Sequence, residues 1–207
     1  MVGALLGWIA GGALSSSSGP ALQTPQATGS SAAQAGASDF PQTPKGAAGA
    51  VANFERAFAS PKILAPGALR KAIEAVATPD YVDRMLAANM PGRNRLAEGP
   101  IGEGIASGMQ TLYSAVPIGY RIESFSPQRA RVLTWGFTLL GNASAVEPEA
   151  YFGLTRTEVV WTEAGWRIAE TKGGFGPTPK LATPPGPLGG YEVIGLASHL
   201  QSYELAP

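Results

Sequence analysis

The chain has 207 residues with 15 basic and 15 acidic side chains, so it lacks the basic excess with which nucleic-acid-binding proteins neutralise phosphates. It contains no cysteine, which excludes disulfides, thiolate nucleophiles and zinc–thiolate centres. Its one histidine, His199, excludes a metal centre built on several imidazoles. We therefore expect no metal and no other cofactor.

The first 46 residues form two segments of unusual composition. Residues 1–14 are apolar and uncharged, but they are shorter than the roughly 20 residues that span a bilayer as a helix, and they lack a basic signal-peptide start. Two interpretations stay open: the end of a membrane anchor or export signal that starts upstream, or an Ala/Gly-rich tail. Residues 15–46 are mostly Ser, Gly, Ala, Gln, Thr and Pro, which predicts a disordered linker.

Four helices are expected after the linker, because apolar residues recur at every third or fourth position. The first covers 47–60 and the second covers 67–77. A third is expected to start at Thr78, with this residue as its N-cap, and to end before Pro91. A fourth is expected over 102–115.

The period of the apolar residues changes to two from residue 118, which is typical of strands with one buried face. Four such strands are expected, over 119–126, 130–140, 151–162 and 166–172. Helices followed by antiparallel strands predict an α+β fold, with N-terminal helices packed on a curved four-stranded antiparallel sheet. The domain is expected to span 47–172. Residues 173–207 then form a Gly/Pro-rich segment that ends in a short amphipathic helix over 191–203.

One hairpin carries a resemblance to a known family. It reads Val159-Val160-Trp161-Thr162-Glu163-Ala164-Gly165-Trp166-Arg167-Ile168-Ala169, an apolar strand ending in Trp, an acidic-Gly turn, and a strand that opens with Trp-Arg-Ile. This stretch resembles the last hairpin of domains with the nuclear transport factor two-like (cystatin-like) fold. The resemblance covers 47–172 and implies a cone-like sheet packed against a helical layer.

A second resemblance concerns the order of the elements and three short segments, Pro117–Arg121, Ser124–Val132 and Trp135-Gly136. Together they resemble the extracytoplasmic scaffold proteins of conjugative transfer and type IV secretion. This resemblance implies a non-enzymatic interaction domain, tethered to the cell membrane or alternatively secreted. It implies as partners other envelope or secretion-complex proteins or further copies of the chain, with membrane contact through the N-terminal segment and no direct contact with nucleic acid.

Few residues fit a catalytic role. Enzymes that resemble this fold, such as ketosteroid isomerases and related dehydratases, place an Asp or an Asp–His pair at the mouth of the cone for proton transfer. Asp80 and Asp83 instead fit the first turn of the predicted third helix, where the helix dipole favours negative charge. His199 falls on the predicted terminal helix. We therefore expect no catalytic residue.

Five strand residues are candidates for binding a ligand or a partner: Trp135, Arg156, Glu158, Trp161 and Trp166. A structural role is open for each, since aromatic residues on alternating strands pack in cores and charged residues pair across strands. The alternative function is small-molecule binding or isomerase/lyase chemistry in the cone cavity. An open apolar cavity with a converging base would favour that alternative, whereas a cavity filled by Trp and Phe would favour a scaffold.

Overall fold

The structure is a computed structural model that describes residues 40–143, 146–179 and 201–202. The predicted apolar segment over 1–14, most of the predicted linker and His199 lie outside the described residues. Within the described part of the chain, no helix is long and apolar enough to cross a membrane.

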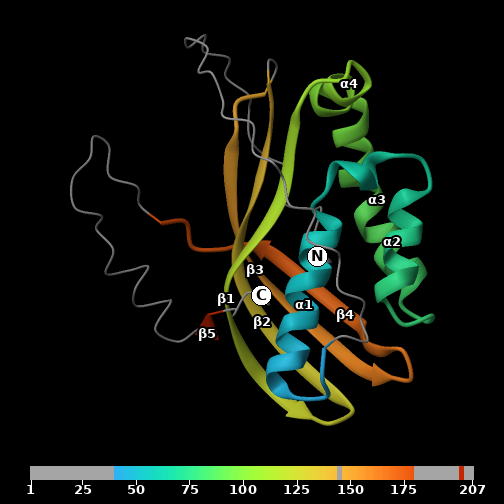
Figure 1. Ribbon diagram of the computed structural model, residues 1–207, viewed down its shortest axis with the longest axis vertical. Helices are drawn as coiled ribbons and strands as arrows, with labels where there is room; N and C mark the ends of the chain where they lie inside the picture. The colour runs from blue at the N-terminus through green and yellow to red at the C-terminus, as the bar shows by residue number, and fades with distance from the viewer. Residues whose placement is uncertain (1–39, 144–145, 180–200, 203–207) are drawn as a thin grey trace.

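The α+β fold predicted from the sequence is confirmed. Helices come first in the chain: α1 (Pro44–Phe58), the 3-10 helix η3 (Pro61–Leu64), α2 (Ala68–Val76), α3 (Val82–Glu98) and α4 (Pro100–Ala106). The strands follow: β1 (Thr111–Ser126), β2 (Arg129–Asn142), β3 (Glu149–Thr162), β4 (Gly165–Phe175) and the short β5 (Gln201–Ser202). Figure 1 shows α1 lying across the four long strands, with α2 and α3 beyond it.

The strands form an open antiparallel sheet in the order β4-β3-β2-β1-β5. Successive side chains of a strand point to opposite faces, which divides the sheet in two. Helix α1 packs on one side of the sheet, which we call the helix-covered face. On this side β2 carries Ala130, Val132 and Thr134, all of which are buried. We call the opposite side the outer face; on β2 it carries Arg131 and Trp135.

The core lies between the helices and the helix-covered face. Fully buried side chains come from α1 (Phe54), α2 (Ile73), β2 (Val132) and β4 (Trp166 and Ile168). These residues share the apolar periodicity that the sequence displays, 3.6 in the helices and two in the strands. The core therefore forms where the apolar stripe of each helix meets one face of the sheet.

The fold includes residues that the sequence assigned to the linker. Thr43 is the N-cap of α1 and accepts a hydrogen bond from the backbone N–H of Gly46 at 3.0 Å, with Pro44 at the first helical position. The indole N–H of Trp166 donates to the carbonyl of Pro41 at 3.0 Å. The predicted boundary at residue 47 is therefore several residues too late.

The predicted limits of the third helix are wrong at both ends. Thr78 is not the N-cap, because α3 begins only at Val82 with Tyr81 in the cap position, and the Thr78 hydroxyl makes no hydrogen bond to any described residue. The backbone N–H of Thr78 instead donates to the carbonyl of Ile168 on β4 at 2.9 Å. Pro91 lies inside α3 and does not end it. A proline removes one backbone hydrogen bond, and here the helix continues because its buried face, which includes Met85 and Leu96, packs on both sides of that position.

The predicted fourth helix over 102–115 is also wrong in its second half. Helix α4 ends at Ala106, and Gly108 adopts a left-handed conformation with φ 74°, which is typical of the residue that follows a helix. Strand β1 then begins at Thr111, opposite Asn142 of β2. Tyr113 lies on β1, where its side chain is buried. Tertiary packing therefore overrides the spacing of apolar residues that predicted a helix at this position.

The C-terminal part differs from the expectation as well. Strand β4 extends to Phe175, beyond the predicted end of the domain at 172. Past it, Gly176 donates to the carbonyl of Phe152 on β3 at 3.1 Å. Most of the predicted helix over 191–203 lies outside the described residues, but Gln201–Ser202 form a strand that pairs with Gly119 and Tyr120. At these two positions the helix prediction is wrong.

Candidate functional site

The five predicted binding residues lie on both faces of the sheet. Trp161 and Trp166 stand opposite each other on β3 and β4, with ring centroids 5.2 Å apart in an edge-to-face arrangement. Trp166 is fully buried and Trp161 partly buried. Both rings belong to the packing of the helix-covered face, which is the structural role left open for them.

Trp135 lies on the outer face and is nevertheless buried. Its indole N–H donates to the carbonyl of Pro177 at 3.2 Å, and its ring centroid is 5.9 Å from that of Phe152. Phe137 extends this aromatic group, at 5.2 Å from Phe152. The segment that follows β4 therefore contacts Trp135 and contributes to its burial.

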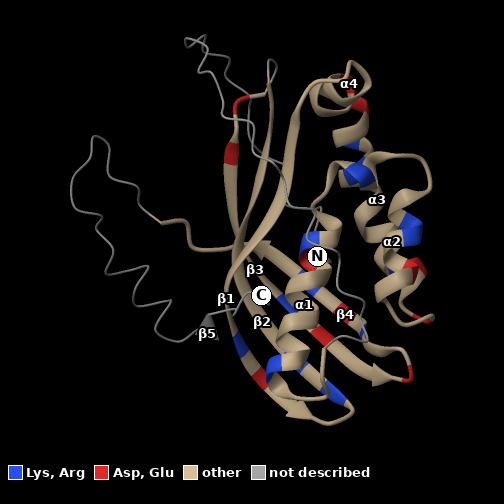
Figure 2. Ribbon diagram, in the orientation of Figure 1, with Lys and Arg blue, Asp and Glu red and all other residues tan. Residues whose placement is uncertain are grey.

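Arg156 and Glu158 lie on the outer face, towards the β1–β2 turn, where Figure 2 shows basic and acidic residues interspersed. They line a hollow of about 420 Å³ together with Glu123, Arg131, Glu170 and Lys172, so that its lining holds three acidic and three basic side chains. Arg121 and Arg129 pair with Glu123 and Glu158 and add two basic side chains, and we call these eight residues together the basic hollow. Arg156 donates to both carboxylate oxygens of Glu123, at 2.6 and 2.8 Å. This guanidinium holds the pKa of Glu123 below its usual range.

Glu158 is the second acidic centre of this face. Its carboxylate accepts from Arg131 at 2.9 Å and pairs with Arg129 at 3.0 Å. The structure therefore does not bring Arg156 and Glu158 together as a pair, although both lie on β3; each is paired with a different neighbour on β1 or β2.

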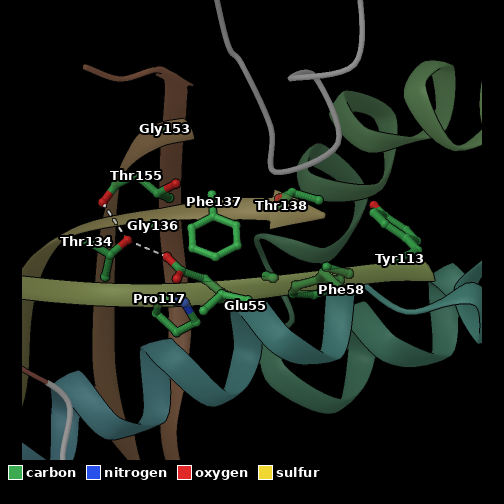
Figure 3. Close-up of a pocket in the computed structure, with 13 residues that line it drawn as sticks. Glu55, Phe58, Tyr113, Pro117, Thr134, Gly136, Phe137, Thr138, Gly153 and Thr155 are labelled. Atoms are coloured by element: carbon green, nitrogen blue, oxygen red, sulfur yellow. Dashed lines mark hydrogen bonds between the residues drawn. The ribbon is translucent and has the colours of Figure 1, made fainter. Parts of the chain in front are cut away.

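A carboxylate that the sequence reasoning did not select lies on the opposite face. Glu55 of α1 points towards β2 and lines a cavity of about 40 Å³, drawn in Figure 3. Burial raises the pKa of Glu55 from its ordinary value of 4.5 to about 7, although the hydrogen bond from Thr134 acts in the opposite direction. The signal for this residue is present in the sequence, since Glu55 lies among the apolar positions Val51, Phe54 and Phe58 of the first predicted helix.

The hydrogen bonds of Thr134 agree with a raised pKa. Its hydroxyl contacts Glu55 Oε1 and also lies 3.2 Å from the backbone carbonyl of Thr155. A threonine hydroxyl has a single proton and can donate to one of these oxygens only. When Glu55 is protonated, its own O–H can donate to Thr134, which then donates to Thr155, and every group in the chain of hydrogen bonds is satisfied.

Two glycines form part of the sheet side of this cavity. Gly136 on β2 and Gly153 on β3 stand directly opposite each other and both line the space below Glu55. Phe58 and Tyr113 also line it, and Figure 3 shows both on the same side of Glu55. The cavity is much smaller than the roughly 300–1,000 Å³ of typical ligand pockets, so it can admit little more than water in this conformation.

No group of three or more His, Asp or Glu side chains arranged to hold a metal ion occurs in the described ranges 40–143 and 146–179.

Comparisons with known proteins give little further information. No protein-family model matches the chain, and no curated protein matches it. Among solved structures, the intermembrane space region of the chloroplast protein ARC6 is similar at 16% sequence identity, over 55% of this chain and 84% of that chain, with a TM-score of 0.31. A likeness at this level carries no argument about fold or function, and the two family resemblances noted in the sequence stay predictions.

Proposed function

We propose that this chain is a non-enzymatic interaction domain of a cell-envelope assembly, held near the membrane by its N-terminal segment. The observation that carries the proposal is the basic hollow, a set of charged side chains held in place by ion pairs on the face of the sheet that points away from α1. Charged arrays of this kind give an interface specificity and steer the approach of a partner. A role in conjugative DNA transfer follows only from the sequence resemblance.

Site-specific photo-crosslinking in the cells that produce the chain tests this proposal. A photoreactive residue at Ser124, an exposed position of β1 opposite Arg131, should yield discrete adducts with envelope proteins or with a second copy. The matched probe at Lys71, exposed on α2, should yield few. Adducts from both positions alike, or from neither, would contradict an interaction through the outer face.

The membrane tether has a separate test. Replacing Leu5, Leu6, Trp8 and Ile9 by Ser removes four of the seven apolar side chains larger than Ala in residues 1–14 and leaves the sequence of the described domain unchanged. We expect the unmodified chain to sediment with membranes and the substituted chain to be released from them. Equal distribution of both chains would show that residues 1–14 do not anchor the domain.

Glu55 favours a second candidate function, small-molecule binding with isomerase- or lyase-type proton transfer. A carboxyl group whose pKa lies near 7 beside an apolar cavity has the property that a general acid–base residue needs at neutral pH. In this role a substrate would first have to widen the cavity of about 40 Å³. The carboxylate of Glu55 would then accept a proton from the bound carbon acid, and Thr134 would orient it. Turnover of a ketosteroid, an epoxide or a small acid by the unmodified chain, abolished by Glu55→Gln, would establish this function instead of the scaffold.

A further inference from the structure

Two of the three acids of the basic hollow are less exposed than the basic side chains paired with them. The side chains of Glu123 and Glu158 are only 18% and 15% exposed, whereas the basic side chains paired with them are 49% to 63% exposed. The latter are Arg121, Arg129, Arg131 and Arg156. A molecule that approaches this face therefore meets these guanidinium groups before Glu123 and Glu158, whereas the third acid, Glu170, is 46% exposed beside Lys172.

The basic hollow carries a local excess of positive charge. Five basic residues (Arg121, Arg129, Arg131, Arg156 and Lys172) accompany three acidic ones (Glu123, Glu158 and Glu170), which gives a net charge of 5 − 3 = +2. The whole chain has no net charge, so this excess is a property of one region. Such a region attracts an anionic partner and repels a cationic one.

The buried acids also hold the guanidinium groups in position. A guanidinium has five N–H donors; Arg156 uses Nε and Nη2 on Glu123, and Arg131 directs Nη2 at Glu158. Because the acids fix these side chains on rigid strands, a ligand loses less side-chain entropy on binding than it would at isolated surface arginines.

We propose that the basic hollow binds a short segment of a partner protein that is rich in Asp and Glu, an inference that rests on the proposed interaction function and names the chemistry of its partner. Carboxylates match the guanidinium fork in bidentate geometry. Nucleic-acid binding commonly uses roughly six to ten contacts between basic side chains and phosphates. An excess of two positive charges is small in comparison, which favours a partner with fewer negative charges. A hollow also fits a protruding peptide better than the flat surface of a bilayer.

The experiment measures fluorescence anisotropy of a deca-glutamate peptide, labelled with a neutral dye, on titration with the full chain at low and moderate salt. We expect binding that weakens as salt increases, and none of a deca-lysine peptide. The double variant Arg121→Glu/Arg129→Glu should bind at least tenfold more weakly. The matched control Arg70→Glu, which changes an equally exposed arginine on α2, should change the affinity less than twofold.

Each other outcome overturns the inference. Absence of deca-glutamate binding, or equal binding by both charge-reversal variants when circular dichroism shows both to be folded, would exclude the hollow as an acidic-segment site. Tighter binding of phosphatidylserine vesicles or of a single-stranded oligonucleotide, lost in the same double variant, would assign the hollow to a membrane or a nucleic acid. If adducts from Ser124 persist while deca-glutamate does not bind, the interaction function stands and only the acidic chemistry fails.

Discussion

The two faces of the sheet are built from the same strands and differ in almost every physical property. On β2, Val132 is fully buried on the helix-covered face, and its neighbour Arg131 is exposed on the outer face. On β3, Thr157 is buried between Arg156 and Glu158, which belong to the basic hollow. Alternation along each strand thus separates residues that stabilise the fold from residues that are available to a partner.

Polar groups occur on both faces but are satisfied in different ways. On the helix-covered face, Thr157 and Thr171 share a hydrogen bond of 3.1 Å, and the phenol of Tyr81 donates to the carbonyl of Thr171 and accepts from its N–H. On the outer face, the polar groups are ion pairs with one member exposed to solvent. Substitutions on the two faces should therefore change different quantities: the free energy of unfolding on one face, and binding on the other.

The largest expected effect is on the helix-covered face. Trp166→Ala removes a fully buried ring and its hydrogen bond to Pro41, and should lower the free energy of unfolding by about 3–5 kcal/mol. Trp161→Ala, at a partly buried ring, should cost less, about 1–3 kcal/mol. Urea denaturation followed by circular dichroism measures both. Equal losses, or a loss below about 0.5 kcal/mol for Trp166, would contradict the packing described.

Glu55 should make stability depend on pH. Because its pKa in the folded state is about 7, above its ordinary 4.5, the folded protein binds more protons than the unfolded chain between these values. Stability from this group is fully present below pH 4.5 and is lost as the pH rises through 7, by up to about 3 kcal/mol. Glu55→Gln should remove this loss and be the more stable protein at pH 8.

Thermal unfolding of Glu55→Gln and the unmodified chain at pH 5 and pH 8 measures the difference. The matched control is Glu74→Gln, which makes the same substitution at an exposed position of α2. A pH dependence that persists in Glu55→Gln would mean that the carboxyl group is not enclosed below α1.

A third prediction concerns the glycines of the sheet. A Cβ at Gly136 would lie 2.6 Å from the carbonyl oxygen of Val116 on the neighbouring strand, so Gly136→Ala should destabilise the fold by about 1–3 kcal/mol. A Cβ at Gly174 would meet nothing within 4 Å, and Gly174→Ala should change stability by less than about 0.5 kcal/mol. Chemical denaturation compares the two variants, and equal values would show that β1 and β2 do not approach closely at Gly136.

The sequence was sufficient for the fold class because its strongest signals are local. The change from a period of 3.6 to a period of two lies close to the point where helices give way to strands, and the alternation over 130–140 and 151–162 places the correct residues on the same face. The predicted element limits are wrong where contacts between residues far apart in the sequence determine the local structure. Thr78 pairs with Ile168, ninety residues later, and Tyr113 is drawn into a strand by pairing with Leu140.

The candidate sites show the same limit. Arg156 and Glu158 could be selected as charged residues on an alternating strand, but their partners Glu123 and Arg131 depend on strand register. Glu55 lies on the apolar side of its helix, but the sequence alone does not show that it borders a cavity. That cavity forms only because Gly136 and Gly153, on two later strands, pair next to it. A carboxylate on an apolar helix face is a signal that sequence reasoning can use.

The smallest expected effect is on the outer face. Arg156 and Glu123 form a bidentate ion pair, but the Arg156 side chain is half exposed, and ion pairs at such positions contribute under about 1 kcal/mol. A double-mutant cycle with Arg156→Ala and Glu123→Ala should give a coupling free energy below that value, which shrinks further in high salt. A coupling free energy above about 2 kcal/mol would place this pair among the groups that stabilise the fold. It would contradict the conclusion that the helix-covered face provides stability while the outer face is available for binding.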